Sequence, residues 1–349
     1  MSTTDTLPEK VHLVGSIALD SVEEVFRATG KLLGRRLKRV PDGEPGGRRL
    51  WISWQYPLLR ANGYLRAEPN LAPAGMFPKL RLADGVKSEE IRFGELGYAR
   101  EARDSYLDFC AARERGRLPR TARFQVCMPT PMGVIWAFWT PPDLLPIYDA
   151  YEQAMIREVE LICRSIPHRD LCIQWDFCHE MIIWDGQPQD MFPLLKASHA
   201  EIMERMRNIC APIPDDVELG FHLCYGDFGG KHFFDPIDAG KMVEVCNALA
   251  QAVKHKIAYI HLPVPLTRGD DAYFKPLADL KLDPGTELYL GLVHGADGAE
   301  GTRKRIAVAG HYVKDFGIAT ECGMARARTP EVVRKLLQVH ADASREPAA

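Results

Sequence analysis

The feature that most constrains the fold is a regular alternation of short apolar runs with longer segments of helical periodicity. Strand followed by helix, repeated around the chain, is typical of a (β/α)8 TIM barrel, in which a parallel sheet closes inside a ring of helices. We therefore expect an α/β chain of this class. The eight candidate strands cover residues 11–16, 37–42, 123–129, 171–177, 216–224, 257–263, 287–293 and 316–322.

Helix start signals lie between these runs. Ser21 precedes an apolar helical period that includes Val25 and Phe26. Thr329 is a candidate N-cap for the last helix, and Pro330 occupies its first turn. A side-chain oxygen at the N-cap accepts a hydrogen bond from a free backbone N–H, and proline is well tolerated at the first helical position. The segments between the strands therefore read as the helices of the barrel.

One segment interrupts the alternation. Residues 63–95 are rich in proline and glycine and carry no long helical period. We expect an insertion after the second strand there, either a hairpin or a lid over the barrel mouth, the end of the barrel where the strands terminate. The sequence shows no convincing linker, and 46% of its 349 residues are hydrophobic, which suffices for one large core. Residues 1–349 are therefore expected to form a single domain.

Charge and composition exclude several classes of partner. The net charge is −3 and the basic residues are scattered, which argues against nucleic acid. The sequence has no run of about 18 apolar residues, so we expect no membrane helix. Its first residues lack a basic and apolar secretion signal, and the nine cysteines are then read as reduced thiols. We expect a cytoplasmic protein with a small-molecule substrate, and the oligomeric state stays open.

Polar or metal-binding side chains end almost every predicted strand. Active sites of such barrels lie at the C-terminal ends of the strands. A concentration of histidine, cysteine and acidic residues at this end therefore predicts a reactive site at the mouth. In chain order the residues are Ser16, Glu44, Trp136 in the third loop, Asp176, His222, Cys224, His261, His294 and Cys322.

The segment VELGFHLCYGDFGG, residues 217–230, ends a strand with His222 and Cys224. Residues two apart in a strand face the same side, and imidazole with thiolate is a ligand pair that zinc prefers. Cys322 ends the eighth strand at the same mouth and is the candidate third ligand. The alternative is a buried histidine beside a packing cysteine, since free cysteine is among the most buried residue types. Candidates for a fourth ligand are His261, His294 and Glu321.

These segments resemble the catalytic domain of cobalamin-independent methionine synthase, in the barrel superfamily that also contains uroporphyrinogen decarboxylase. FHLCYGDF and, much later, TECGMARARTPEVVRKLL are similar to the family's zinc-binding H-x-C pair and distant cysteine. The remaining similarities follow in the same order along the chain. LVGS resembles the first-strand I-G-S, PDGEPGGR the G-E segment, MPTPMGVIWAFW the G-P-x-T…W loop, and CIQWDF the strand that carries an acidic residue.

The resemblance implies roles for the residues that match. His222, Cys224 and Cys322 would bind zinc. A flat, pterin-like partner would lie near Trp136, which makes a folate-type methyl donor a candidate co-substrate. The residues implied to hold the amino-acid part of a thiol substrate are Ser16, Glu44 and Asp176.

The sequence also departs from the family. The sixth strand ends in Ile260-His261-Leu262-Pro263, where the family has a glutamate ligand. His261 is therefore expected to be the additional ligand, and a neutral imidazole leaves the site one charge more positive than a carboxylate. The acidic strand lacks the family's D-E-P, and the chain lacks the separate N-terminal barrel of the long-form synthases.

Three functions compete for such a site. A thiolate-rich zinc site binds an incoming thiol and presents it as a nucleophile for a methyl or other alkyl group. A more Lewis-acidic zinc, with His261 as ligand, favours a lyase or hydrolase that acts on a small molecule, aromatic ones included. A zinc that is fully coordinated by protein would be structural, in a non-catalytic barrel. The resemblance favours the transferase.

Further residues near the predicted mouth are candidates for substrate binding or proton transfer. His179 and Glu180 follow the fourth strand and are candidates for general acid or base, while Asp227 is a candidate to orient His222. Arg326 and Arg328 either bind an anionic group or are solvated charges. All six tryptophans fall in or beside predicted loops or strand tops, which suits a flat or apolar ligand unless they pack the insertion onto the barrel.

Overall fold

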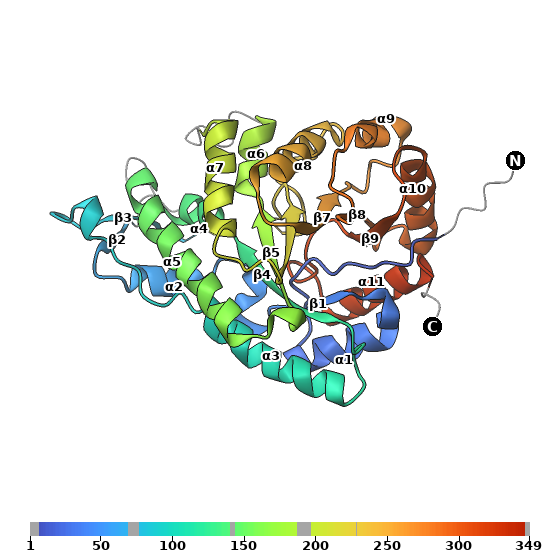
Figure 1. Ribbon diagram of the computed structural model, residues 1–349, viewed down its shortest axis with the longest axis horizontal. Helices are drawn as coiled ribbons and strands as arrows, with labels where there is room; N and C mark the ends of the chain where they lie inside the picture. Colours follow the sequence, from blue (N-terminus) through green and yellow to red (C-terminus); the bar gives the residue numbers. More distant parts are fainter. Residues whose placement is uncertain (1–6, 69–76, 140–143, 187–196, 228, 346–349) are drawn as a thin grey trace, which may run out of the picture.

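The structure is a computed structural model that describes residues 7–68, 77–139, 144–186, 197–227 and 229–345. Its centre is a curled parallel sheet, shown in Figure 1, in which seven described strands pair in chain order. These strands are β1 (Arg39–Pro41), β4 (Arg123–Pro129), β5 (Leu171–Phe177), β6 (Glu218–Leu223), β7 (Ile257–Pro263), β8 (Glu287–Val293) and β9 (Phe316–Thr320). Seven of the eight predicted strands are therefore present, some shorter than expected.

The run predicted as the first strand is the exception. Val11 makes isolated parallel bridges to Leu37 and to Ile318, so the chain at this point links the two edges of the sheet. After Val11, side chains rather than a neighbouring strand bond to the backbone carbonyls. Gln125 Nε2 donates to Leu13 O (2.9 Å) and Gln174 Nε2 donates to Val14 O (2.6 Å). Because these carbonyls accept from side chains inside the sheet, residues 11–16 form no regular strand. The arrangement is consistent with a TIM-like barrel.

The helices surround the sheet. In chain order α1, α3, α5, α7 and α8 each contact the next, α10 contacts α11, and α11 returns to α1 (Figure 1). The short 3-10 helix Lys275–Asp279 contacts both α8 and α10 and spans the gap between them. The bounds are α1 (Val22–Leu33), α2 (Gln55–Arg60), α3 (Tyr98–Glu114), α4 (Pro131–Phe138), α5 (Leu144–Ser165), α6 (His179–Asp185), α7 (His199–Cys210), α8 (Gly240–Ala252), α9 (Asp271–Phe274), α10 (Gly298–Tyr312) and α11 (Pro330–Asp342).

The predicted helix starts are confirmed at both ends of the chain. Ser21 Oγ accepts from the backbone N–H of Glu24 (3.2 Å) at the start of α1. Thr329 is the N-cap of α11, with Pro330 in its first turn. Each cap satisfies a backbone donor that the helix itself leaves free.

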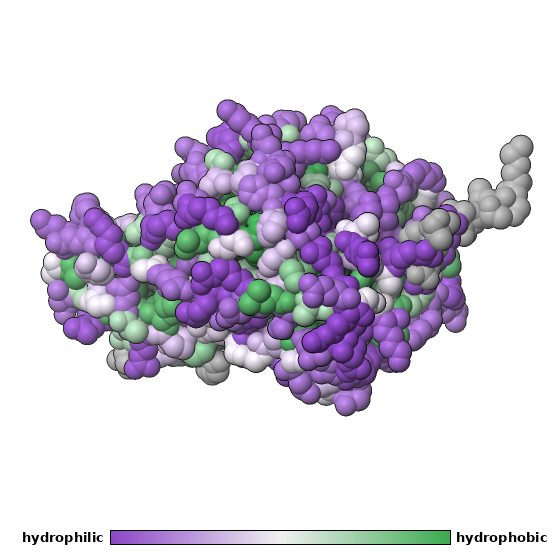
Figure 2. All heavy atoms as spheres, turned by 60° about the horizontal axis from the view of Figure 1, so that its bottom comes forward, coloured by the Kyte–Doolittle hydropathy of each residue, from purple (hydrophilic) through white to green (hydrophobic). Residues whose placement is uncertain are grey.

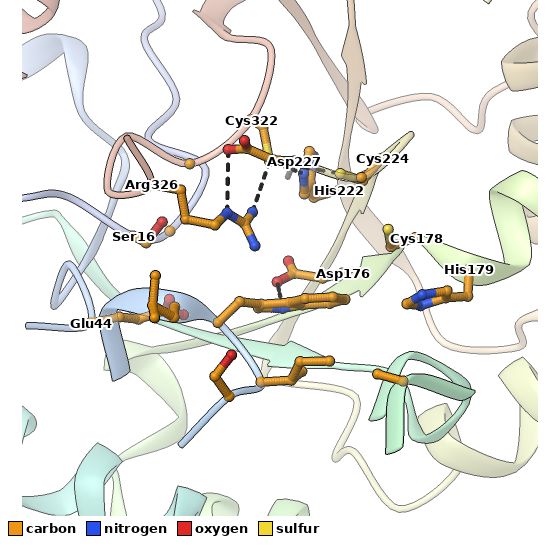
Figure 3. Close-up of a pocket in the computed structure, with 18 of the residues that line it drawn as sticks. Ser16, Glu44, Asp176, Cys178, His179, His222, Cys224, Asp227, Cys322 and Arg326 are labelled. Atoms are coloured by element: carbon orange, nitrogen blue, oxygen red, sulfur yellow. Dashed lines mark hydrogen bonds and ion pairs between the residues drawn. The ribbon is translucent and has the colours of Figure 1, made fainter. Parts of the chain in front are cut away.

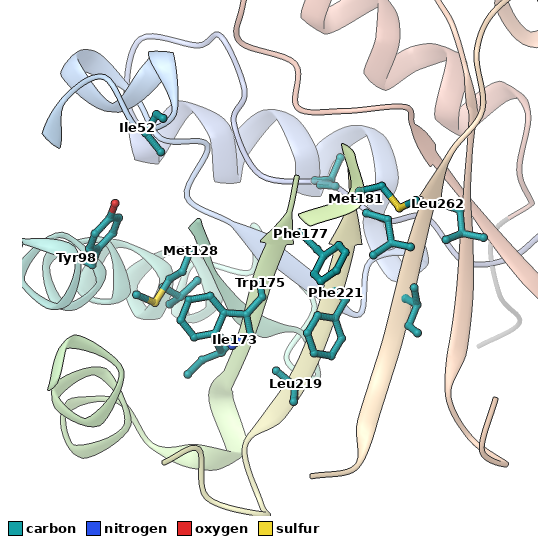
Figure 4. Packing of buried hydrophobic residues seen from close by; sticks show 14 of the residues in the cluster. Ile52, Tyr98, Met128, Ile173, Trp175, Phe177, Met181, Leu219, Phe221 and Leu262 are labelled. Atoms are coloured by element: carbon teal, nitrogen blue, oxygen red, sulfur yellow. The ribbon is translucent and has the colours of Figure 1, made fainter. Parts of the chain in front are cut away.

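Alternation along the central strands separates two environments. Trp175 and Phe177 on β5, with Phe221 on β6, belong to the large apolar cluster between sheet and helices (Figure 4). Their neighbours in sequence point to the other side of the sheet, because successive side chains of a strand alternate. On that side Asp176 of β5 is the register partner of His222 of β6, and His222 is the partner of His261 of β7. Three polar side chains thus lie in one row across the sheet.

The segment predicted as an insertion contains a hairpin. Strands β2 (Leu65–Glu68) and β3 (Lys79–Leu82) pair antiparallel and form a separate sheet. Lys79 Nζ donates to the carbonyls of Trp136 (3.2 Å) and Ala137 (2.7 Å) and so joins the hairpin to the end of α4. Residues 69–76 lie outside the described part of the chain, and the role of residues 63–95 as an insertion or lid stays a prediction, as does the single domain.

The described surface is mostly polar. Figure 2 shows one face on which hydrophilic side chains dominate and hydrophobic ones form small, separate patches. Within the described residues, every helix is too short or too polar to cross a bilayer.

Candidate metal and substrate site

Three buried side chains bring their ligand atoms together at the C-terminal end of the sheet. His222 lies one residue before the end of β6, Cys224 follows directly after that strand, and Cys322 follows β9 (Figure 3). Cys322 Sγ lies 3.7 Å from both Cys224 Sγ and His222 Nε2. Within the described residues these are the ones whose ligand-capable atoms form a group, all within 4.8 Å of one another. The sequence prediction that these three residues converge is confirmed as geometry.

The spacing of these atoms fits a tetrahedral zinc ion. Bonds of about 2.3 Å to sulfur place neighbouring tetrahedral ligand atoms about 3.8 Å apart, close to the observed 3.7 Å. Burial holds the pKa of His222 well below its ordinary value, so the imidazole is neutral and able to ligate. Contact with Cys224 and burial raise the pKa of Cys322. Without a cation, the two thiols therefore stay protonated, and a bound zinc would stabilise their thiolates.

His261 lies behind His222 rather than beside the two thiols. Its Nδ1 is 2.7 Å from Nδ1 of His222, whereas His222 Nε2 faces Cys322. His261 was the expected fourth ligand, but its ring lies outside the group of three ligand atoms. The geometry instead suits a residue that holds the His222 ring through its second nitrogen.

The other two candidates for a fourth ligand are engaged elsewhere. His294 Nε2 lies 2.9 Å from the carbonyl oxygen of Val264. Glu321 lies 3.8 Å from His232. Neither belongs to the group of ligand atoms found in the described chain.

A cavity of about 400 Å³ opens beside the three ligands, a size suited to a small molecule. All four residues predicted to bind substrate line it: Ser16, Glu44, Asp176 and Trp136. The sequence prediction that these residues share one cavity with His222, Cys224 and Cys322 thus agrees with the structure, while their role in binding stays a prediction.

Two of the carboxyl groups that line this cavity, those of Asp176 and Glu44, have unusual acidities. Asp176 accepts hydrogen bonds from Trp51 Nε1 (3.0 Å) and Gln174 Nε2 (2.9 Å), yet burial raises its pKa to about 7. Burial and the neighbouring Asp176 raise the pKa of Glu44 to about 8. Glu44 also has a positive φ of 51°, a conformation that places this non-glycine residue in a tight turn. Two buried carboxyls near neutrality are typical of functional sites.

The three residues predicted to be catalytic have different positions. His179 lines the cavity, with its ring 4.5 Å from that of Trp136 and 6.1 Å from that of Trp51, and burial lowers its pKa to about 3. Glu180 is buried in the first turn of α6 with a pKa raised to about 7, but it is not among the described residues that line the cavity.

Asp227 also lines the cavity, but its charge partner is not His222. Its carboxylate lies 3.4 Å from Nε of Arg326 and 3.7 Å from Nη1 of Arg328. The nitrogen of His222 that Asp227 was expected to orient faces His261. This pairing could not be predicted from proximity in the loop, because strand register determines which side chain faces His222.

Two further residues line the cavity: Cys178, which the sequence did not single out, and Arg326, which the sequence left as either an anion-binding residue or a solvated charge. Cys178, the N-cap residue of α6 directly after β5, packs with Cys224 and Cys322 in a small apolar cluster. Arg326 donates from Nη2 to Cys322 Sγ (3.6 Å), and its side chain is only 17% exposed. One interpretation of Arg326 from the sequence was a solvated surface charge. Its low exposure shows that this interpretation is wrong.

Comparisons with known proteins agree at the level of fold. The chain has a TM-score of 0.62 with a B12-independent methionine synthase from Shewanella sp. W3-18-1, solved in complex with selenomethionine, at 14% identity and covering 97% of both chains. It has a TM-score of 0.52 with a methyltransferase from Methanosarcina mazei, at 12% identity, covering 97% of this chain and 94% of the other. No family model matches the sequence, and no curated protein matches it either. The chain therefore shares the fold of methionine synthase and methyltransferase structures, as the sequence resemblance predicted.

Proposed function

We propose that this protein is a zinc-dependent enzyme that transfers a methyl or other alkyl group to a thiol. The observation that carries the proposal is the convergence of the ligand atoms of His222, Cys224 and Cys322, in which the two 3.7 Å distances from Cys322 Sγ fit the edges of a tetrahedral site. The cavity beside them gives a substrate access to that site. The fold shared with a methionine synthase and a methyltransferase supports the same class of reaction.

Zinc held by these residues would present the sulfur of an incoming thiol as a thiolate at neutral pH. In the transfer, the thiol proton would be released to solvent when the thiol binds. The sulfur–carbon bond would then form as the bond between the alkyl carbon and its donor breaks, and the donor would leave with that electron pair and take up a proton from solvent. Ser16, Glu44 and Asp176 would bind polar groups of the thiol substrate. The rings of Trp136 and His179, whose centres lie 4.5 Å apart, offer an aromatic surface for the donor, for which a folate-type molecule is the candidate.

The number of protein ligands bears on the competing functions. Three ligands leave one tetrahedral position for substrate, as in catalytic zinc sites, whereas a structural site uses four. This favours an enzyme over a non-catalytic barrel. The lyase or hydrolase alternative depended on ligation by His261, and His261 faces His222 instead.

The test asks whether a thiol binds directly to the metal held by His222, Cys224 and Cys322. Cobalt(II) would replace zinc, and L-homocysteine would be added while the sulfur-to-cobalt charge-transfer absorption is recorded. We expect the absorption to rise as the thiol joins the metal, and S-methyl product to appear by mass spectrometry once 5-methyltetrahydrofolate is supplied. Cys322→Ser should abolish both signals, and Cys110→Ser, on the outer helix α3, should abolish neither. An absorption that homocysteine leaves unchanged would contradict the proposal.

A further inference from the structure

We propose that Arg326 is the anion-binding residue of this cavity and that the ligand is a small carboxylate with a flat, apolar body. The inference deepens the proposed function and rests on it for one point, that this ligand is a substrate of the enzyme. The argument depends on the hydrogen-bonding state of the guanidinium group, on the charges that face it, and on the shape of the cavity wall.

The guanidinium of Arg326 is enclosed but poorly satisfied. Its Nη2 makes one long contact with Cys322 Sγ (3.6 Å), and its Nε is buried without a hydrogen-bond acceptor. Asp227 lies 3.4 Å away, but neither of its carboxylate oxygens makes a hydrogen bond with any described residue. A buried donor without an acceptor costs stability, and such groups in native proteins usually await a ligand or solvent. Figure 3 shows the group extended into the cavity, between Asp227 and Asp176.

The carboxyl groups near Arg326 leave its hydrogen-bonding capacity unfilled. Asp227 is shared between two guanidinium groups, those of Arg326 and Arg328. Asp176 is engaged by neutral donors, Trp51 and Gln174. Glu44 is the remaining carboxyl that lines the cavity, and burial keeps it largely protonated near neutral pH, since its pKa is about 8. No described carboxylate therefore makes a hydrogen bond with the Arg326 guanidinium, and the planar fork of arginine matches a carboxylate in bidentate geometry.

The apolar residues that line the cavity beside Arg326 indicate what kind of molecule fits there. The guanidinium carbon of Arg326 lies 5.8 Å from the centre of the Trp51 ring. Apolar side chains from separate elements complete the lining around this ring: Leu50, Phe77, Phe138 and Phe233. Largely apolar walls with a few convergent polar groups are typical of sites for small ligands. A flat ring that carries one carboxylate satisfies both features.

The test compares benzoate, benzamide and acetate by isothermal titration calorimetry, on zinc-loaded and zinc-free protein. Benzoate carries both the charge and the flat body, benzamide lacks the charge, and acetate lacks the body. We expect benzoate to bind at least about tenfold more tightly than either of the others, because a charge-assisted pair with a buried arginine contributes on this scale. Equal binding of benzoate and benzamide would overturn the inference.

Substitutions at Arg326 and at the neighbouring Arg328 test whether benzoate binding depends specifically on Arg326. Arg326→Gln should bind benzoate at least about tenfold more weakly and should no longer distinguish it from benzamide, while Arg326→Lys should keep part of the preference. Arg328→Gln removes the same charge from a side chain outside the cavity lining and is the matched control. An equal loss in both Gln variants would show a general charge effect and overturn the assignment. Circular dichroism establishes that each variant is folded.

The zinc-free arm keeps this inference distinct from the proposed function. Benzoate that binds only to zinc-loaded protein, and equally well to Arg326→Gln, is a metal ligand, and the inference is then wrong. Arg326-dependent binding by a protein that holds no zinc and methylates no thiol would support the inference and refute the proposed function.

Discussion

The Nδ1 atoms of His222 and His261 lie 2.7 Å apart on neighbouring strands β6 and β7. One of the two nitrogens must carry the hydrogen of this bond. His222 Nε2 faces Cys322 and must be unprotonated to bind a metal, so in the proposed zinc site Nδ1 of His222 would be the donor and His261 the acceptor. In that site His261 would have a positioning role and the metal would have three protein ligands.

The first prediction concerns that positioning role. His261→Asn keeps an acceptor near the position of Nδ1, whereas His261→Leu removes it. We expect zinc affinity, measured by competition with a chromogenic chelator, to fall about 10- to 100-fold in His261→Leu and much less in His261→Asn. An equal loss in both variants would indicate that His261 ligates the metal, and no loss in either would show that it does not position His222.

The second prediction concerns the pH dependence of stability. Glu44 has its pKa raised from 4.5 to about 8, so between these values the folded state binds a proton that the unfolded state has released. The free energy of unfolding contributed by Glu44 is then highest at low pH and falls as pH rises from about 4.5 to 8. Glu44→Gln should lose this dependence and be more stable than wild type at pH 8.5, by on the order of 1–3 kcal/mol.

Urea unfolding of the zinc-free protein at pH 5 and pH 8.5 measures this effect. The exposed Glu89 provides the matched control, since Glu89→Gln should follow wild type at both pH values. A difference between Glu44→Gln and wild type that does not grow with pH would contradict the assigned acidity of Glu44.

The third prediction concerns a glycine in β6. A Cβ at Gly220 would lie 2.1 Å from ring atoms of Tyr259, whose hydroxyl donates to Gln174 (2.9 Å) below the site. Gly220→Ala should therefore lower the free energy of unfolding by about 1–3 kcal/mol, because the ring must move against close-packed neighbours. Gly63→Ala, where a Cβ meets open space, should change it little. Thermal denaturation of the two variants measures both, and equal midpoints would contradict the close approach at Gly220.

Strand spacing made much of this architecture predictable. The alternation of apolar runs located the strands, and the two-residue period placed His222 and Cys224 on one side of β6. Parallel strands end at one face, so Cys322 could be placed with them although it lies 98 residues further on. These inferences need only the period of a strand and the polarity of a parallel sheet.

Other features depend on side-chain partners that a linear pattern does not contain. Residues 11–16 have the composition of a strand, but Gln125 and Gln174 take up the carbonyls of Leu13 and Val14. His261 has the right position for a ligand, but its Nδ1 faces the ring of His222. Arg326 looks like a surface charge in sequence, and only its packing at the cavity wall buries it.

The most direct measurement is zinc analysis of the purified protein under metal-replete conditions, by inductively coupled plasma mass spectrometry. The account predicts about one zinc per chain in wild type and its loss in Cys224→Ser and Cys322→Ser, because each variant removes one of three ligands. Cys110→Ser, on the outer helix α3, should retain the metal. A wild-type protein without zinc, or zinc retained in both site variants, would contradict the metal site and the function proposed from it.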